Sequence, residues 1–196
     1  MRYPNGKPYK KSEETNKPDK GHRSLLSAAN RGMSLEEDIN LSNDYYREAG
    51  KALINKRPTP VNIVKVDYSH GARITDAYFE KQSTTDYNGV YKGRYIDFEA
   101  KNTKSTTSFP LSNISEHQIV HLKNVIKHGG IAFFIISFQI HNEIYLLDAS
   151  FVIEFYEHGK RKSIPYEVFK ENGYLIKQDY SPRLHYLDAV DELYFK

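Results

Sequence analysis

The sequence predicts an α/β domain built on a mixed β-sheet that is flanked by helices. Helix-like segments and strand-like runs follow one another in the order α-β-β-β-β-α-β-β-α, which is typical of this class. Residues 131–138 (IAFFIISF) are apolar throughout, as expected of a strand that is covered on both faces. The 196 residues are enough for one domain with a sizeable core.

The first helix is expected to begin at Ser34, because Ser34 and Glu37 have the spacing of a capping box. The helix should end before Pro58, which cannot donate a backbone hydrogen bond to it. Two strand-like runs follow at residues 61–68 and 73–79. The apolar or amphipathic positions at helical spacing are Leu35, Ile39, Tyr46, Ala49 and Leu53.

The second half of the chain predicts further elements. Ser115 and Gln118 form a second capping box, and the helix that they open should stop at Gly129-Gly130. The remaining elements expected here are strands at 131–138, 143–148 and 151–156 and a closing helix at 187–194.

Composition excludes several classes of protein. The chain has no cysteine, which excludes disulfide scaffolds, thiolate metal sites and cysteine nucleophiles. No apolar run approaches the roughly 20 residues that a membrane-spanning helix needs, and no signal-peptide core precedes the domain. A P-loop pattern is also missing, which argues against an ATP-driven enzyme. We therefore expect a soluble, cytoplasmic protein with no membrane association.

Basic residues gather in two parts of the chain, although the formal net charge is only +3. Residues 1–31 hold eight basic and three acidic residues, and residues 47–104 hold eleven and seven. This distribution favours a polyanionic partner such as a nucleic acid. Residues 1–30 are poor in large apolar side chains, so we expect a flexible basic arm followed by a single domain over 31–196.

A hairpin with a turn at Lys92-Gly93 carries the most specific pattern. A two-residue turn pairs Tyr91 with Arg94 and places Asp86 directly opposite Glu99. Because side chains alternate along a strand, one face should carry Thr84, Asp86, Asn88, Asp97, Glu99 and Lys101. The other face should pack into the core through Thr85, Tyr87, Ile96, Phe98 and Ala100.

Two opposed carboxylates repel each other unless a cation lies between them. Mg²⁺ suits the position, because it prefers oxygen ligands and commonly takes one or two carboxylates; Mn²⁺ is a substitute. Thr84 adds a hydroxyl and Lys101 an ammonium at the edge of the site. These groups predict metal-dependent phosphodiester hydrolysis with Asp86, Glu99 and Lys101 as catalytic residues. The alternative is an ordinary polar hairpin edge.

The pattern Asp86…Glu99-Ala100-Lys101 resembles the D…(D/E)-x-K core of the restriction-endonuclease-like nucleases, with Thr85 where a proline often stands. The chain also resembles the RecU family of Holliday junction resolvases almost from end to end. The matching stretches are residues 2–7, 30–33, 56–60, 82–89, 91–101, 107–111 and 117–119.

This resemblance implies a restriction-endonuclease-like fold and a homodimeric, Mg²⁺-dependent endonuclease that nicks four-way DNA junctions symmetrically during recombination and repair. It also implies RecA recombinase as a partner and a protruding stalk over about residues 58–81. In the family, metal ligands match Thr84, Asp86, Glu99 and Gln118, and the transition-state stabiliser matches Lys101. The capping role of Gln118 remains an alternative. DNA contacts are expected from Lys56, Arg57, Arg73, Lys81 and Arg94.

Other interpretations remain beside this one. Glu36 is a candidate accessory acid on the first helix. His117 and His121 have the spacing of a zinc-protease motif, but Gln118 replaces the general base, so we expect both on a helix surface. The chain could instead be a non-catalytic DNA-junction-binding protein, or a nuclease of the same fold that acts on other branched or duplex DNA.

Overall fold

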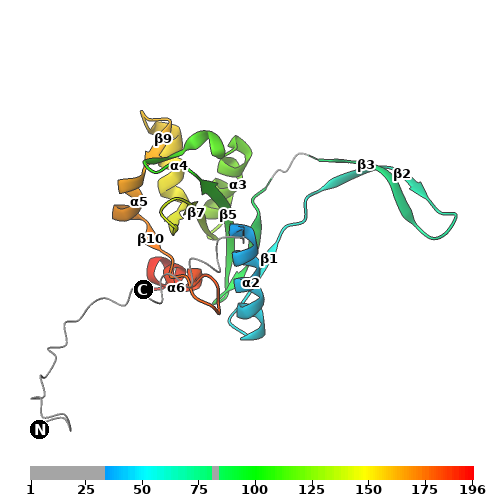
Figure 1. Cartoon of the computed structure of the whole chain (residues 1–196), viewed down its shortest axis with the longest axis horizontal. Coiled ribbons are helices and arrows are strands. Elements are labelled where there is room, and N and C mark those ends of the chain that lie inside the picture. Colours follow the sequence, from blue (N-terminus) through cyan, green and yellow to red (C-terminus); the bar gives the residue numbers. More distant parts are fainter. Residues whose placement is uncertain (1–33, 81–83) are drawn as a thin grey trace, which may run out of the picture. The chain divides into compact units, whose positions relative to one another are not determined.

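The computed structural model describes residues 34–80 and 84–196. Its centre is a six-stranded mixed sheet in the order β1-β4-β5-β7-β8-β10. Figure 1 labels β1, β5, β7 and β10 of this sheet. β5 and β7 are parallel, and the other neighbouring strands are antiparallel. The strands are β1 (Ala52–Lys56), β4 (Tyr87–Tyr91), β5 (Arg94–Thr103), β7 (Ile131–Phe138), β8 (Glu143–Asp148) and β10 (Tyr174–Leu175).

Helices cover both faces of this sheet. They are α2 (Leu35–Glu48), α3 (Glu116–Lys127), α4 (Ala149–His158), α5 (Tyr166–Asn172) and α6 (Tyr186–Tyr194), with a short 3-10 helix, η2, at Leu111–Asn113. Phe133 on β7 packs in one core with α2 and α6, and its neighbour Phe134 packs in the other core with α3, α4 and α5. All eight residues of β7 are buried, which confirms the predicted strand. The predicted class, a mixed sheet flanked by helices, is also confirmed.

One predicted helix is too long and one predicted strand is wrong. The first helix begins at the predicted Ser34 cap and ends before Pro58, but it stops at Glu48 and does not reach Leu53, because Gly50 adopts a φ of +63° and turns the chain into β1. Leu53 therefore lies on an edge strand and is exposed. Residues 151–156 belong to α4 instead of a strand: the side chain of Asp148 accepts a hydrogen bond from the N–H of Ser150 and caps the helix, while Val152 is buried. The chain also forms β6 (Ser108–Pro110), β9 (Ser163–Pro165), β10 and α5, which had no clear sequence signal.

A separate antiparallel hairpin consists of β2 (Val61–Asp67) and β3 (Arg73–Phe79). Every residue of β3 is exposed, and the pairing has a bulge between Ile63 and Val66. The hairpin occupies the segment for which the sequence predicts a stalk. The predicted arm at residues 1–30 and the predicted DNA contact at Lys81 lie outside the described residues. Over the described ranges, no helix is long and apolar enough to span a membrane.

Candidate active site

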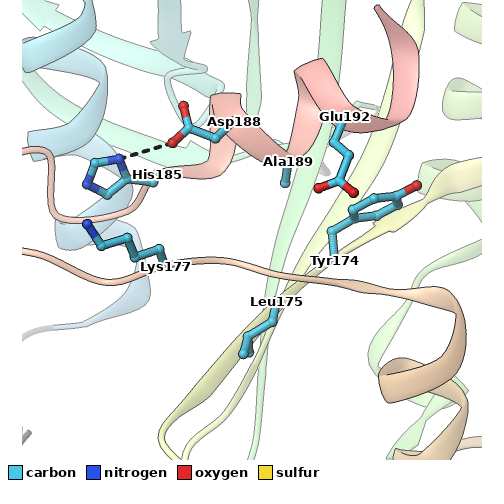
Figure 2. A pocket seen from close by; sticks show the side chains of 7 residues that line it. All are labelled: Tyr174, Leu175, Lys177, His185, Asp188, Ala189 and Glu192. Carbon is cyan, nitrogen blue, oxygen red and sulfur yellow. Dashed lines mark ion pairs between the residues drawn. The ribbon is translucent and has the colours of Figure 1, made fainter. Parts of the chain in front are cut away.

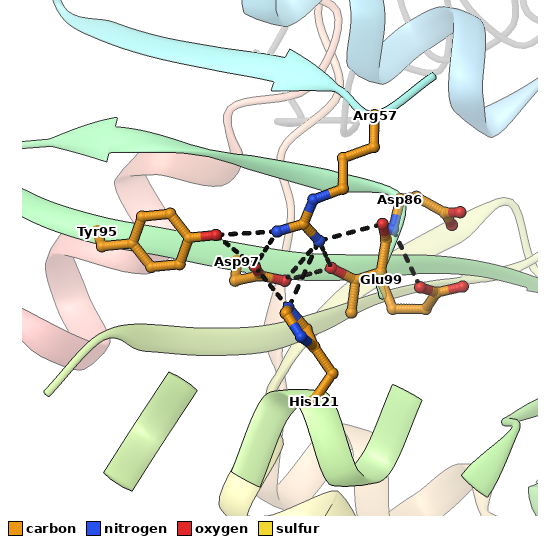
Figure 3. Close-up of polar contacts among 7 residues, drawn as sticks. Arg57, Asp86, Tyr95, Asp97, Glu99 and His121 are labelled. Atoms are coloured by element: carbon orange, nitrogen blue, oxygen red, sulfur yellow. Dashed lines mark hydrogen bonds and ion pairs between the residues drawn. The ribbon is translucent and has the colours of Figure 1, made fainter. Parts of the chain in front are cut away.

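The β4–β5 hairpin has the register that the two-residue turn predicts. Tyr91 pairs with Arg94, and Tyr87 pairs with Phe98. Asp86 comes next along the chain and lies against Glu99, as Figure 3 shows: the N–H of Asp86 donates to Glu99 Oε2 across 3.2 Å. In return, the N–H of Ala100 donates to Asp86 Oδ2 across 3.4 Å. The predicted apposition of the two carboxyl groups is therefore present.

Glu99 is fully buried and is held from two sides. Gln118 Nε2, on α3, donates to Glu99 Oε1 across 2.6 Å, and Lys101 Nζ lies 2.8 Å from the same oxygen. Burial and the nearby Asp86 charge raise the pKa of Glu99 to about 8, although Lys101 opposes this shift. A buried carboxyl group that resists ionisation is a position that a cation would stabilise.

The donor set fits a hard divalent cation. Among the residues that the structure describes, no three acidic, histidine or cysteine side chains converge as a metal cluster. The oxygens that the structure brings together are instead those of the Asp86 and Glu99 carboxyl groups. Gln118 faces Glu99 with its amide nitrogen, while its amide oxygen accepts from the N–H of Ser115. Thr84 is half-buried in the segment that leads to Asp86. Mg²⁺ commonly takes one or two carboxylates and fills its other positions with water, so this set suits it better than zinc.

A second group of polar side chains lies one step along the same face of β5. Asp97 is completely buried and contacts four other side chains, including the Thr85 hydroxyl, which donates to Asp97 Oδ1. The other distances to Asp97 Oδ2 are 2.7 Å from Arg57 Nη2, 2.8 Å from Tyr95 Oη and 3.0 Å from His121 Nε2 (Figure 3). Burial raises the pKa of Asp97, but the hydrogen bonds from His121, Thr85, Arg57 and Tyr95 outweigh it and hold the pKa below its ordinary value.

This group corrects two predictions. Thr85 points toward Asp97 instead of into the opposite core, because the chain leaves the strand before Tyr87. His121 is not a simple surface residue: it is half-buried and contacts Asp97. One signal in the sequence points to this group. Asp97 lies two residues before Glu99, on the same face of the strand, and His121 lies three residues after Gln118, on the same face of the helix.

The predicted DNA contacts lie in different surroundings. Arg73 is exposed on β3, whereas Arg57 is held by Asp97. Arg94 Nη2 donates to Gly129 O across 3.1 Å. Lys56 forms an ion pair with Glu36 on α2.

Glu36 lies beside Tyr87, the first residue of β4. Tyr87 Oη donates to Asn40 Oδ1 across 3.1 Å and lies 3.4 Å from Glu36 O. The pKa of Tyr87 is raised by burial and then by the charges of Glu36, Asp86 and Glu99. The charges of the three acids therefore all act on one phenol, and the accessory role of Glu36 stays a prediction.

A small cavity of about 140 Å³ lies apart from this centre, between β10 and α6 (Figure 2). Its lining includes His185 and Asp188, which are 3.3 Å apart, together with Lys177 and Glu192. None of the predicted site residues lines it.

Comparisons with known proteins give the family. The profile of "RecU: Recombination protein U" matches residues 30–192. The chain is 52% identical over 200 residues to "Holliday junction resolvase RecU" of Geobacillus kaustophilus (strain HTA426) and 52% identical over 201 residues to that of Geobacillus sp. (strain WCH70). The protein of the same name from Bacillus cytotoxicus is 51% identical over 200 residues. Each alignment covers 100% of this chain and 98% of the relative.

A solved structure is also similar: Hjc of Archaeoglobus fulgidus, described as a Holliday junction resolvase from an archaeal hyperthermophile. Its TM-score is 0.41 at 12% identity, with 70% of this chain and 94% of that chain covered. The family match and the full-length relatives are much stronger evidence of the family than this structure is. The chain belongs to the RecU family.

Proposed function

We propose that this chain is a Mg²⁺-dependent endonuclease that resolves Holliday junctions by symmetric nicking in homologous recombination and DNA repair. The observation that carries the proposal is the apposition of Asp86 and Glu99 beside Lys101, in a chain that belongs to the RecU family. The relatives in this family are named Holliday junction resolvases. A homodimer supplies two such centres, one for each of two symmetric cuts.

The residues of the centre have separate roles. Asp86, Glu99, Thr84 and Gln118 would hold the metal, and the Asp86 N–H keeps the Glu99 carboxyl group oriented. The bound cation supplies charge neutralisation and a more acidic water. Lys101, whose Nζ lies 2.8 Å from Glu99, keeps an ammonium at the edge of the site, where it stabilises the negative charge that develops on the attacked phosphate.

Glu36 acts as an accessory acid through its position near Asp86 and Glu99. Its charge is one of those that raise the pKa of Tyr87, which supports this position. The Glu36→Gln variant should therefore turn over more slowly while junction binding persists. Unchanged turnover would remove Glu36 from the site.

DNA binding uses surfaces outside the carboxylate centre. The exposed β2–β3 hairpin, with Arg73, is the proposed stalk, and Lys56, Lys81, Arg94 and the basic arm of residues 1–30 contact phosphates. Binding should weaken steeply with salt, since it depends on phosphate neutralisation.

The protein acts in the cytoplasm, with RecA recombinase as a partner.

Cleavage of four-way, flap and linear duplex DNA of matched sequence tests the proposal. Each substrate is incubated with the full chain in Mg²⁺, in Mn²⁺ and in EDTA, and the nicks on every strand are mapped. Paired symmetric nicks confined to the four-way substrate and dependent on the metal support the proposal. Equal cutting of linear DNA would make the chain a nuclease of other substrates, and binding without cutting would make it a non-catalytic junction-binding protein.

A further inference from the structure

Residues 84–86 carry two of the proposed metal ligands, yet they lie outside the β-ladder. The pairing of β4 with β5 begins at Tyr87 and Phe98, so the strand itself does not fix the orientation of Asp86. Arg57 holds this segment instead. Its main-chain N–H donates to Asp86 O across 2.7 Å, and its Nη1 donates to Thr85 Oγ1 across 2.6 Å and to Thr85 O across 3.2 Å.

The same guanidinium is fixed by Asp97. Arg57 Nη2 lies 2.7 Å from Asp97 Oδ2, and only 19% of the Arg57 side chain is exposed, against none of the Asp97 side chain. Tyr95 Oη donates to the same carboxylate, and His121 Nε2 lies 3.0 Å from it, as Figure 3 shows. A buried carboxylate that is satisfied by several partners forms a rigid base, because moving any partner leaves the charge unpaired.

The geometry relates this base directly to the metal centre. Asp97 and Glu99 lie two residues apart on one face of β5 and are both buried. Each carboxylate meets one side chain of α3: Glu99 lies 2.6 Å from Gln118, and Asp97 lies 3.0 Å from His121. Two parallel contacts therefore bind α3 to β5, one inside the proposed metal site and one beside it.

We propose that Asp97, Arg57 and His121 form a positioning clamp that orients residues 84–86 for metal binding. The inference rests on the proposed function, because it concerns the same metal site. The charge of Arg57 favours a phosphate contact, but the clamp gives this residue another role, because its guanidinium already contacts Thr85 and Asp97. Removing groups that orient metal ligands typically costs about 10–100-fold in metal affinity or activity.

Arg57→Lys is the decisive variant, because it keeps the charge and removes the forked geometry. Arg47→Lys is its control, since Arg47 is an exposed residue that pairs with Asp44. Mn²⁺ affinity is measured by electron paramagnetic resonance on the full chain without DNA, and junction affinity by gel shift in EDTA. We expect Arg57→Lys to bind Mn²⁺ about 10–100-fold more weakly and to lower kcat, with junction affinity unchanged and Arg47→Lys like the wild type.

A phosphate contact predicts the opposite result. Arg57→Lys would then bind Mn²⁺ and cleave like the wild type, and Arg57→Ala would lower junction affinity and reduce the salt slope by about one. That result would overturn the clamp.

The Thr85 pair keeps the test valid if Arg57→Lys fails to fold, as judged by circular dichroism. Thr85→Val removes the hydroxyl between Arg57 and Asp97 and should lose Mn²⁺ affinity, whereas Thr85→Ser keeps the hydroxyl and should restore it. Equal Mn²⁺ binding by both would overturn the clamp. Asp86→Asn separates the proposed function from the clamp. If this variant still binds Mn²⁺ and cleaves, the proposed function fails. If it is inactive while the Arg57 and Thr85 variants are normal, only the clamp fails.

Discussion

The side-chain amide of Gln118 donates from Nε2 to Glu99 Oε1 across 2.6 Å, while its Oε1 accepts from the main-chain N–H of Ser115 across 2.9 Å. The sequence leaves open whether Gln118 caps α3 or belongs to the metal site. In the structure, one amide caps the helix and also lies against the buried carboxyl group. The start of α3 is thereby bound to the centre of β5.

Gln118→Ala should affect both stability and metal binding. The variant loses a cap and leaves Glu99 without one partner, so the free energy of unfolding should fall by about 1–3 kcal/mol. Denaturant unfolding measures this loss, and Mn²⁺ titration should show weaker binding. Asp148→Ala is the matched control, because it removes a side-chain cap from α4, which carries none of the proposed site residues. If Gln118→Ala binds Mn²⁺ as well as Asp148→Ala does, the role of Gln118 is capping alone.

The raised pKa of Glu99 predicts how stability depends on pH without metal. The pKa is about 8 in the folded chain and about 4.5 unfolded, so between these values the folded state holds the extra proton. Stability should therefore fall as pH rises from 5 to 8, by at most about 1.4 kcal/mol per pH unit. Urea unfolding across this range in EDTA checks the slope. Mg²⁺ should reduce the fall, since it binds the ionised carboxyl group.

Glu99→Gln provides the control for this pH dependence. The amide does not titrate, so the slope that Glu99 contributes should disappear. A wild-type slope that persists in Glu99→Gln would assign the effect to other groups.

Gly89 is required where β1 pairs with β4. A Cβ at this position would lie 2.1 Å from Leu53 O and 2.6 Å from Ile54 Cα, both of them backbone atoms of β1. Gly89→Ala should therefore push β1 away and lower the free energy of unfolding by about 1–3 kcal/mol. Hydrogen exchange should show faster exchange in β1. Val90→Ala, at an exposed neighbour, should change stability by only about 0.5 kcal/mol or less; equal losses in the two variants would contradict the close approach.

The local signals in the sequence predict much of the fold. Ser34 with Glu37 locates the start of α2, and the turn at Lys92-Gly93 sets the register that brings Asp86 to Glu99. These features depend on neighbouring residues or on a two-residue loop. Residues 151–156 are rich in β-branched and aromatic side chains, but capping by Asp148 and burial of Val152 favour a helix there. The β-propensity of these residues does not predict the helix, because it does not take tertiary packing into account.

The group around Asp97 is the part of the site that sequence reasoning missed. Arg57 lies 40 residues before Asp97, and His121 lies 24 residues after it. Their contact depends on how β1 pairs with β4, how β4 pairs with β5 and how α3 packs on β5. Charge alone favours an exposed Arg57 on DNA, and only the structure shows that a buried carboxylate holds it.

The central claim is that Asp86 and Glu99 hold the metal and Lys101 assists cleavage. The most direct test maps the cuts made on a four-way junction in Mg²⁺ by the wild type, Asp86→Asn and Lys101→Ala, with junction affinity measured in parallel by gel shift. We expect symmetric paired nicks from the wild type, and from the variants no detectable nicks but normal junction binding. Cutting by either variant at a rate near that of the wild type would contradict the assigned site.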